Sequence, residues 1–251
     1  MFAQAKPDIV ISTTSGGSYD TQKLLIDCAV EAKVTRFVPA EFGHDSLNEK
    51  IQERLPPLRE KARTIEYLNR LSAGGRISWV AIATGCLLDY GLQSGNLGFD
   101  LKWQSATLHG NGDERFAASS VHWLGQVVRS VITHWDQVQN RYLYVAGTVT
   151  SSNEVLQCLE DASGKQWQAG RAETAECVRE AERRIERGFP DAAMFLMERS
   201  LLYDQGLAAL QPFSKQDAKS TLGLQEERLK DVVQSVLHHA KHHSSEGCGC
   251  D

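Results

Sequence analysis

The chain has 251 residues, of which 41% are hydrophobic and 24% are charged, and this suits one large domain or one domain with a small addition. Such a composition excludes collagen-like, mucin-like and fully disordered chains. The 27 Lys and Arg residues are outnumbered by 32 Asp and Glu residues, and the net charge of −5 favours neither nucleic acid nor an anionic membrane as a partner.

The sequence also argues against a membrane span and a secretory leader. No apolar run approaches the ~18–20 residues that cross a bilayer. Residues 1–7 lack a charged and then apolar leader, so a cytoplasmic protein is expected. The six cysteines are too scattered for a disulfide framework and are expected to be mostly reduced and buried.

The first part of the chain alternates apolar runs with amphipathic segments. Strands are predicted at 8–12, 35–38 and 77–83, because these runs are short, apolar and rich in β-branched residues. Helices are predicted between them at 20–33 and 58–71. The apolar faces expected are Leu24, Leu25, Cys28, Ala29 and Ala32 on the first helix, and Leu58, Ala62, Ile65, Leu68 and Leu71 on the second. Three buried strands separated by two helices indicate parallel β/α units, so the fold class is α/β.

The second part of the chain is more varied. Residues 86–117 are rich in Gly, Asn and Asp, and a helix at 119–134 and a strand at 142–145 then resume the α/β alternation. Ser151 and Glu154 are spaced as a capping box that opens the next helix. The chain is expected to be helical from residue 173 onward, with solvated charged faces.

Three segments predict a ligand site at one edge of the sheet. Segments 13–17, 39–43 and 84–86 follow the three predicted strands, and ligands of parallel α/β sheets bind beyond the carboxyl ends of the strands. Their small residues would let a cofactor approach the backbone, and their hydroxyl groups can bond ribose or amide groups. Taken singly, each segment is equally compatible with an ordinary βα turn.

Lys61 is the candidate for chemistry near this edge. It lies in the first turns of the helix after the second strand, where a lysine could hold a nicotinamide ribose or act as a general acid or base. Alone, it is also typical of a solvated surface lysine.

Two other patterns are interpreted as incidental. Tyr19 and Lys23 match the Tyr-x-x-x-Lys spelling of short-chain dehydrogenases, but they lie one β/α unit too early for that role. The tail 238–251 carries four histidines and two cysteines, yet its Cys-Gly-Cys spacing is not a standard zinc motif, so no functional metal site is expected.

Together these segments resemble the NmrA-like, isoflavone-reductase-like family of atypical short-chain dehydrogenases, particularly its fungal branch. The resemblance covers about residues 8–235, and its most specific blocks are PAEFG at 39–43 and TGCLLDYGL at 84–92. It implies an incomplete Rossmann-like parallel sheet with a smaller, mostly helical substrate lobe, and NADP as cofactor. It implies that Lys61 is the catalytic acid or base. The implied cofactor-binding residues are Thr14, Ser15, Gly16, Pro39, Phe42, Lys61, Thr84, Gly85 and Cys86.

The sequence departs from the family at its start. Family members begin with a strand and a Gly-x-x-Gly-x-x-Gly turn that receives the pyrophosphate, and this sequence has none. Its first strand looks like the fourth of the family, so roughly 60–80 residues are expected to be missing, which would leave an unpaired apolar sheet edge. The domains expected are a truncated nucleotide-binding domain at 1–160 with a substrate-lobe insertion at 86–117, a helical substrate lobe at 161–237 and the tail at 238–251.

Two functions follow from the resemblance. The first is an NADPH-dependent oxidoreductase acting on a small aromatic or polyketide secondary metabolite, which would lie against segment 87–117 and the C-terminal helices. The second is a non-catalytic dinucleotide-sensing or partner-binding protein, or an inactive truncated product. The absent phosphate loop favours the second, and Lys61 favours the first.

Overall fold

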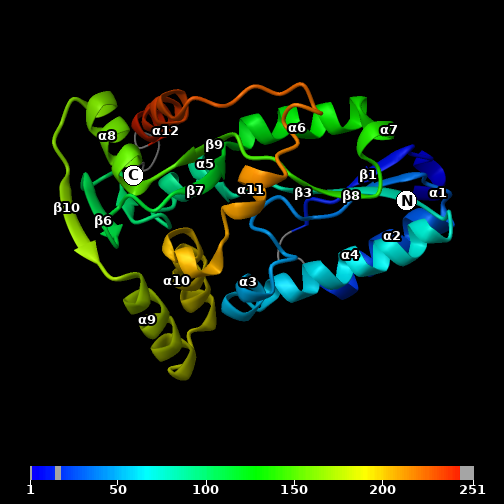
Figure 1. The fold of residues 1–251 in the computed structure, drawn as a ribbon, viewed down its shortest axis with the longest axis horizontal. Coiled ribbons are helices and arrows are strands. Elements are labelled where there is room, and N and C mark those ends of the chain that lie inside the picture. Colours follow the sequence, from blue (N-terminus) through cyan, green and yellow to red (C-terminus); the bar gives the residue numbers. More distant parts are fainter. Residues whose placement is uncertain (1, 15–17, 244–251) are drawn as a thin grey trace, which may run out of the picture. The chain divides into compact units, whose positions relative to one another are not determined.

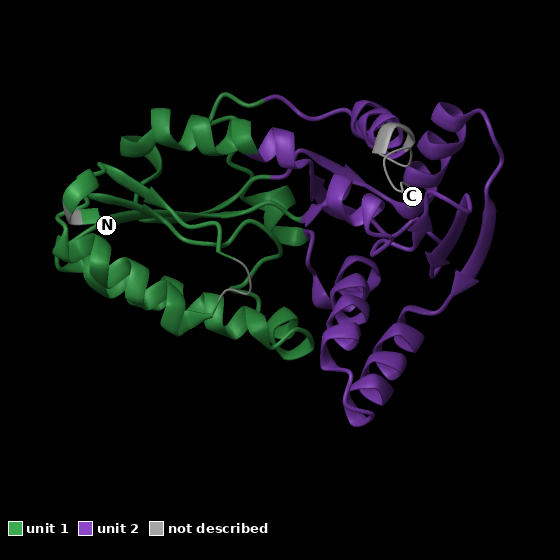
Figure 2. Cartoon of the chain, turned by 180° about the vertical axis from the view of Figure 1, so that it is seen from behind, with its two compact units in different colours: residues 1–85, 125–145, 211–224 green, residues 86–124, 146–210, 225–251 purple. Residues whose placement is uncertain are grey.

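The computed structural model describes residues 2–14 and 18–243 and divides into two compact units (Figure 2). The first unit contains residues 1–85, 125–145 and 211–224, and the second contains 86–124, 146–210 and 225–251. Each unit is therefore assembled from three separate stretches of chain. The predicted domain division at residue 160 stays a prediction. No helix of the described residues is long and apolar enough to cross a membrane.

The first unit is built on a four-stranded parallel sheet (Figure 1). The strand order is β1 (Ile9–Ile11), β2 (Arg36–Val38), β3 (Ser78–Ala83) and β8 (Arg141–Tyr144). All three pairings are parallel, which confirms the predicted α/β class. The helices of this unit are α1 (Phe2–Ala5), α2 (Tyr19–Glu31), α3 (Glu49–Arg54), α4 (Pro57–Ala73), α6 (Val121–Thr133) from Gly125 onward, α7 (Trp135–Val138) and α11 (Gln211–Lys215).

Strand β1 lies at one end of this sheet. Among the described residues it pairs only with β2, with Val10 opposite Phe37. All three of its residues are half-buried. The apolar edge expected from the sequence is therefore present in the part of the chain that the structure describes.

The core of the first unit packs α2 and α4 against the sheet. The predicted face of α4 is confirmed for Leu58, Ile65, Leu68 and Leu71, which are buried, whereas Ala62 is half-buried. The core residues are Ile26, Ala29, Val34, Phe37, Ile65, Leu68, Leu71, Ile77, Trp79 and Ala81.

The predicted face of α2 was wrong in part. Ala29 is buried as predicted, and Leu25 and Ala32 are half-buried, but Leu24 is 64% exposed and Cys28 is exposed. Gln22 and Ile26, which were not predicted, are buried. Apolar residues occur nearly all around this helix, so their spacing alone did not fix the face. Gln22 lies on the buried face of α2, because its amide group turns inward to the hydrogen-bond partners described below.

The second unit contains short strands as well as helices. One three-stranded sheet has the order β4 (Cys86–Leu87), β7 (Phe116–Ser119), β9 (Thr148–Thr150), and another has the order β10 (Gln168–Ala172), β6 (Ser105–His109), β5 (Phe99–Asp100). The helical segments are α5 (Leu88–Gln93), α8 (Ser152–Ser163), α9 (Thr174–Glu186), α10 (Pro190–Tyr203), η1 (Gln205–Leu207) and α12 (Leu229–His243). Helix α12 continues through His243, so the first six residues of the expected tail are helical, and 244–251 lie outside the described residues.

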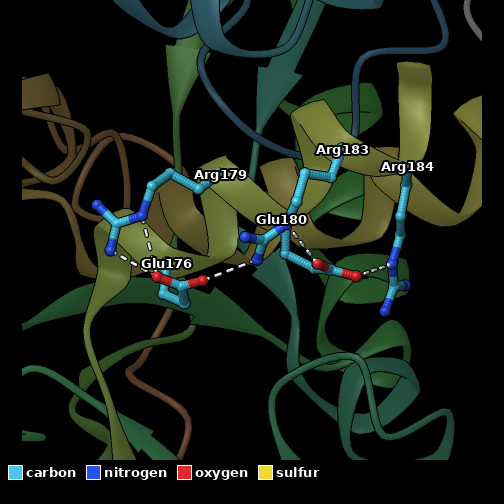
Figure 3. A network of polar contacts seen from close by, with 5 residues as sticks. All are labelled: Glu176, Arg179, Glu180, Arg183 and Arg184. Carbon is cyan, nitrogen blue, oxygen red and sulfur yellow. Dashed lines mark hydrogen bonds and ion pairs between the residues drawn. The ribbon is translucent and has the colours of Figure 1, made fainter. Parts of the chain in front are cut away.

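Helix α9 carries the charged face expected from residue 173 onward (Figure 3). Glu176 pairs with Arg179 at 2.6 Å and with Arg183 at 2.8 Å, and Glu180 pairs with Arg183 and Arg184. These side chains are 33–57% exposed, so solvent screens each pair and its contribution to stability is small. The network gives α9 a solvent-exposed charged face and adds little to the stability of the fold.

The capping box at the start of α8 is confirmed. The Ser151 hydroxyl accepts a hydrogen bond from the Glu154 N–H at 3.3 Å, and the Glu154 carboxylate accepts one from the Ser151 N–H at 3.1 Å. We expect Ser151→Ala to lower the free energy of unfolding by about 1 kcal/mol, because it removes this cap. Urea denaturation measures the change. Ser235→Ala, at an exposed position inside α12, is the control and should stay within about 0.5 kcal/mol of the wild type.

Candidate functional site

The described parts of the three predicted segments in the first unit, residues 13–14, 39–43 and 84–85, lie at one edge of its sheet. The Ser12 N–H donates to the Val38 carbonyl at 2.8 Å, which joins the ends of β1 and β2. The Gly43 carbonyl accepts from the N–H groups of Thr84 and Gly85 at 2.9 and 3.1 Å, which joins the loop after β2 to the end of β3. The predicted convergence at the carboxyl edge is confirmed by these bonds.

Gln22 of α2 links two of these segments. It is 2% exposed, and its Nε2 donates to the hydroxyl oxygens of Ser12 at 2.8 Å and Thr14 at 2.7 Å. Its Oε1 accepts from the Ala40 N–H at 3.3 Å. Gln22 was not predicted from the sequence, because its role depends on partners 8 to 18 positions away. The signal available in the sequence for Gln22 was a side-chain amide on the helix that follows a candidate ligand loop.

Lys61 reaches the same edge from α4. Its Nζ donates to the Glu41 carbonyl at 2.7 Å, and the residue is half-buried. Pro57 opens the helix at a position where a missing N–H costs no hydrogen bond, so Lys61 falls within its first turns. The structure therefore brings Lys61 to the loop after β2, as predicted.

The loop after β2 contains two buried carboxyl groups that the sequence analysis also missed. Glu41 is 2% exposed and Asp45 is 5% exposed. The hydroxyl of Tyr142 donates to Glu41 Oε2 at 3.1 Å, and that of Tyr144 donates to Asp45 Oδ1 at 3.2 Å. Both tyrosines lie on β8 two residues apart, so they point to the same face of the sheet. The loop is thus fixed to a strand that lies about a hundred residues further along the chain.

Burial sets the protonation of this cluster. It raises the pKa of Glu41, against the charge of Lys61 and hydrogen bonds from Ser46 and Tyr142, which lower it. It also raises the pKa of Asp45, against the Leu47 N–H and the Tyr144 hydroxyl. The pKa of Tyr142 lies well above its usual value, first because of burial and then because of Glu41 and Asp45. Both tyrosines therefore remain hydrogen-bond donors across the physiological pH range.

The backbone of the loop is strained at one point. Phe42 has a φ of +23°, which a bulky side chain seldom adopts, and the preceding Glu41 N–H donates to the Pro39 carbonyl at 2.8 Å. Such conformations persist where the surroundings determine them, and they concentrate at functional sites. The same loop carries His44, an imidazole that is 9% exposed.

The other predicted residues are placed as follows. Thr14 is exposed, Phe42 is half-buried, and Pro39, Thr84 and Gly85 are buried. Ser15 and Gly16 lie outside the described residues. Cys86 belongs to the second unit, where it is 7% exposed in the apolar core and burial raises the pKa of its thiol.

Comparison with known proteins identifies the family. The NmrA-like family model matches residues 2–201. The chain belongs to the NmrA-like family. It is 31% identical over 231 residues to "Oxidoreductase aprR" of Aspergillus flavus, a match that covers 92% of this chain and 77% of that protein. It is 27% identical to "Oxidoreductase poxI" of Penicillium oxalicum, with 94% and 76% covered.

Solved structures share the fold of this NmrA-like chain. A leucoanthocyanidin reductase–NADPH complex from Vitis vinifera superposes with a TM-score of 0.72 at 16% identity, covering 94% of this chain and 80% of that one. "AtPrR2 with NADP+ and (+)pinoresinol" gives 0.71 at 18%, with 94% and 78% covered. At these identities the superpositions establish a Rossmann-like fold.

The Tyr19 and Lys23 pair of this NmrA-like chain has other partners. Lys23 Nζ forms an ion pair with Asp27 at 2.6 Å, and the Arg63 guanidinium lies 4.2 Å from the centre of the Tyr19 ring. Asp27 also accepts a hydrogen bond from Tyr67. These contacts are those of a helix surface, so the interpretation of the motif as incidental agrees with the structure.

Proposed function

We propose that this NmrA-like protein is an NADPH-dependent oxidoreductase of the isoflavone-reductase-like type, with Lys61 as its proton-transferring group. The observation that carries the proposal is the position of Lys61 Nζ, 2.7 Å from the Glu41 carbonyl, at the edge where three loops join. The names of the relatives, which are oxidoreductases, and the NADP+ and NADPH complexes among the structural neighbours support it.

The residues at this edge fit the nicotinamide half of the cofactor. Thr14 offers an exposed hydroxyl, and Gly85, with a φ of +71°, offers backbone without a side chain. We assign Pro39, Phe42 and Thr84 to the same half. When bound, NADPH supplies the hydride. No Gly-x-x-Gly-x-x-Gly loop exists in the sequence for the pyrophosphate, so contacts to that half are not assigned.

Lys61 would act at Nζ. The ammonium donates one hydrogen to the Glu41 carbonyl, which orients the group at this edge of the sheet. A proton passed from Nζ to the substrate neutralises negative charge that develops as the hydride arrives. The raised pKa of Tyr142 keeps its proton in place, so Lys61 is the better donor.

The proposed substrate is a small aromatic molecule or a polyketide from secondary metabolism. The structural neighbours include a complex with (+)-pinoresinol, an isoflavone reductase and a leucoanthocyanidin reductase, and the compounds in these names are all aromatic. Segment 87–117 and the C-terminal helices are proposed to select it, and a cytoplasmic location belongs to the same proposal.

Transfer of deuterium from NADPH labelled at C4 tests the reaction. We expect one deuterium in the product when the full chain is incubated with (+)-pinoresinol, an isoflavone or a leucoanthocyanidin, as measured by mass spectrometry. No labelled product across these three probes would contradict the proposed aromatic class.

The second candidate is a dinucleotide sensor without catalysis. Saturable NADPH binding without oxidation of NADPH by any of the three probes would favour it over the enzyme.

A further inference from the structure

The hydroxyl group of Tyr142, in the first unit, connects two residues of the loop after β2. The Ser46 N–H donates to the Tyr142 hydroxyl oxygen at 3.0 Å, so one lone pair of that oxygen is occupied. The hydroxyl hydrogen is then directed to Glu41 Oε2 at 3.1 Å. In the bond from Ser46 the tyrosine oxygen is the acceptor, because a backbone N–H can only donate.

Glu41 is held at both of its ends. Its carboxyl group accepts from Tyr142, and its main-chain carbonyl accepts from Lys61 Nζ at 2.7 Å. The next residue, Phe42, has the strained φ of +23°. A strained peptide relaxes when one of its restraints is removed, so the carbonyl position depends on the restraint at the carboxyl group.

From these contacts we infer that Tyr142 and Glu41 are positioning residues for Lys61: Tyr142 fixes the buried Glu41 carboxyl group, and this fixes the carbonyl that orients the Lys61 ammonium. This inference rests on the proposed function, in which Lys61 transfers the proton. Neither residue touches the substrate or the cofactor in this assignment; they act through Lys61.

The charged and titratable neighbours of Tyr142 and Glu41 also influence the charge of the Glu41 carboxyl group. Burial disfavours the charged form of Glu41 most strongly, and Asp45 in the same loop adds to this effect. Lys61 on α4, Ser46 in the loop and Tyr142 on β8 favour the charged form. Loss of the Tyr142 hydroxyl removes one favourable hydrogen bond to the carboxylate. The Lys61 ammonium then faces less negative charge and a less well-fixed carbonyl, so a larger fraction of Lys61 is neutral.

The test is competitive labelling of Lys61 with trace acetic anhydride, read by mass spectrometry on the full chain between pH 7 and 11. Only the neutral amine reacts, so the rate reports the ammonium fraction without a substrate. We expect Tyr142→Phe to raise the Lys61 labelling rate at pH 8 by about three- to tenfold and to move the midpoint of its pH profile downward. Loosened packing alone would raise the rate without moving the midpoint.

Tyr67→Phe is the matched control. It removes a hydroxyl-to-carboxylate bond of the same kind, between Tyr67 and Asp27, from the helix that carries Lys61. It should leave the Lys61 midpoint unchanged. Glu41→Gln is a second, nearly isosteric test that also applies if Tyr142→Phe does not fold, and it should move the midpoint in the same direction.

Unchanged midpoints in Tyr142→Phe and Glu41→Gln, or an equal change in Tyr67→Phe, would overturn the inference. Turnover measurements distinguish a failure of the positioning role from a failure of the proposed function. If Lys61→Met is inactive but Tyr142→Phe retains the kcat of the Tyr67→Phe control, the proposed function stands and the positioning role fails. If Lys61→Met keeps full turnover, the proposed function itself fails.

Discussion

Replacement of Lys61 by methionine is expected to lower kcat by about 10²–10⁴-fold, the range typical of a lost general acid or base. The methionine keeps most of the side-chain volume but has no proton to transfer and no donor for the Glu41 carbonyl. NADPH binding should weaken by no more than about tenfold, because at most one hydrogen bond to the cofactor is lost. Steady-state kinetics and calorimetric titration measure the two quantities.

Lys50→Met is the matched control for this experiment. Lys50 is an exposed lysine on α3 of the same unit. Its replacement removes the same charge from the protein but should leave kcat within about twofold of the wild type. A Lys61→Met protein that turned over as fast as Lys50→Met would show that Lys61 is a surface lysine.

The second large effect is expected in the core of the first unit. Leu68 on α4 is completely buried, and Leu68→Ala should lower the free energy of unfolding by about 2–5 kcal/mol, because it removes apolar contacts and leaves a cavity. Urea denaturation followed by circular dichroism measures this change.

Leu24→Ala provides the comparison within α2. Leu24 is 64% exposed, so its truncation should change the free energy of unfolding by less than about 0.5 kcal/mol. An equal loss of stability in Leu24→Ala and Leu68→Ala would mean that α2 buries the face expected from its apolar spacing. That result would contradict the burial of Gln22.

The local sequence pattern was sufficient to predict the helix and the strand that carry the site. The predicted helix 58–71 corresponds to α4 (Pro57–Ala73), and the predicted strand 77–83 corresponds to β3 (Ser78–Ala83). Both have strong periodicity or a continuous apolar run, which are the signals that single sequences carry best. The loops at the carboxyl edge followed from the direction of parallel strands alone.

Long-range polar pairing was beyond the same reasoning. Glu41 and Tyr142 are separated by 101 positions, and nothing local marks Tyr142 as the partner of a buried acid. The parallel pairing of β10 with β6 was missed for a similar reason: four of the five β10 residues are exposed and one of them is Gly170, so the segment lacks an apolar signal. Gln22 shows the converse case, a polar residue that sets the buried face of its helix.

Protection of Lys61 by NADPH tests the central claim most directly. The 251-residue chain is titrated with NADPH while the acetylation of each lysine is followed by mass spectrometry. Saturable protection of Lys61, with Lys50 unaffected, is the predicted result, because the dinucleotide would bind at the edge where the Glu41 carbonyl holds Lys61. Equal labelling of Lys61 with and without saturating NADPH would contradict a nicotinamide site at this edge.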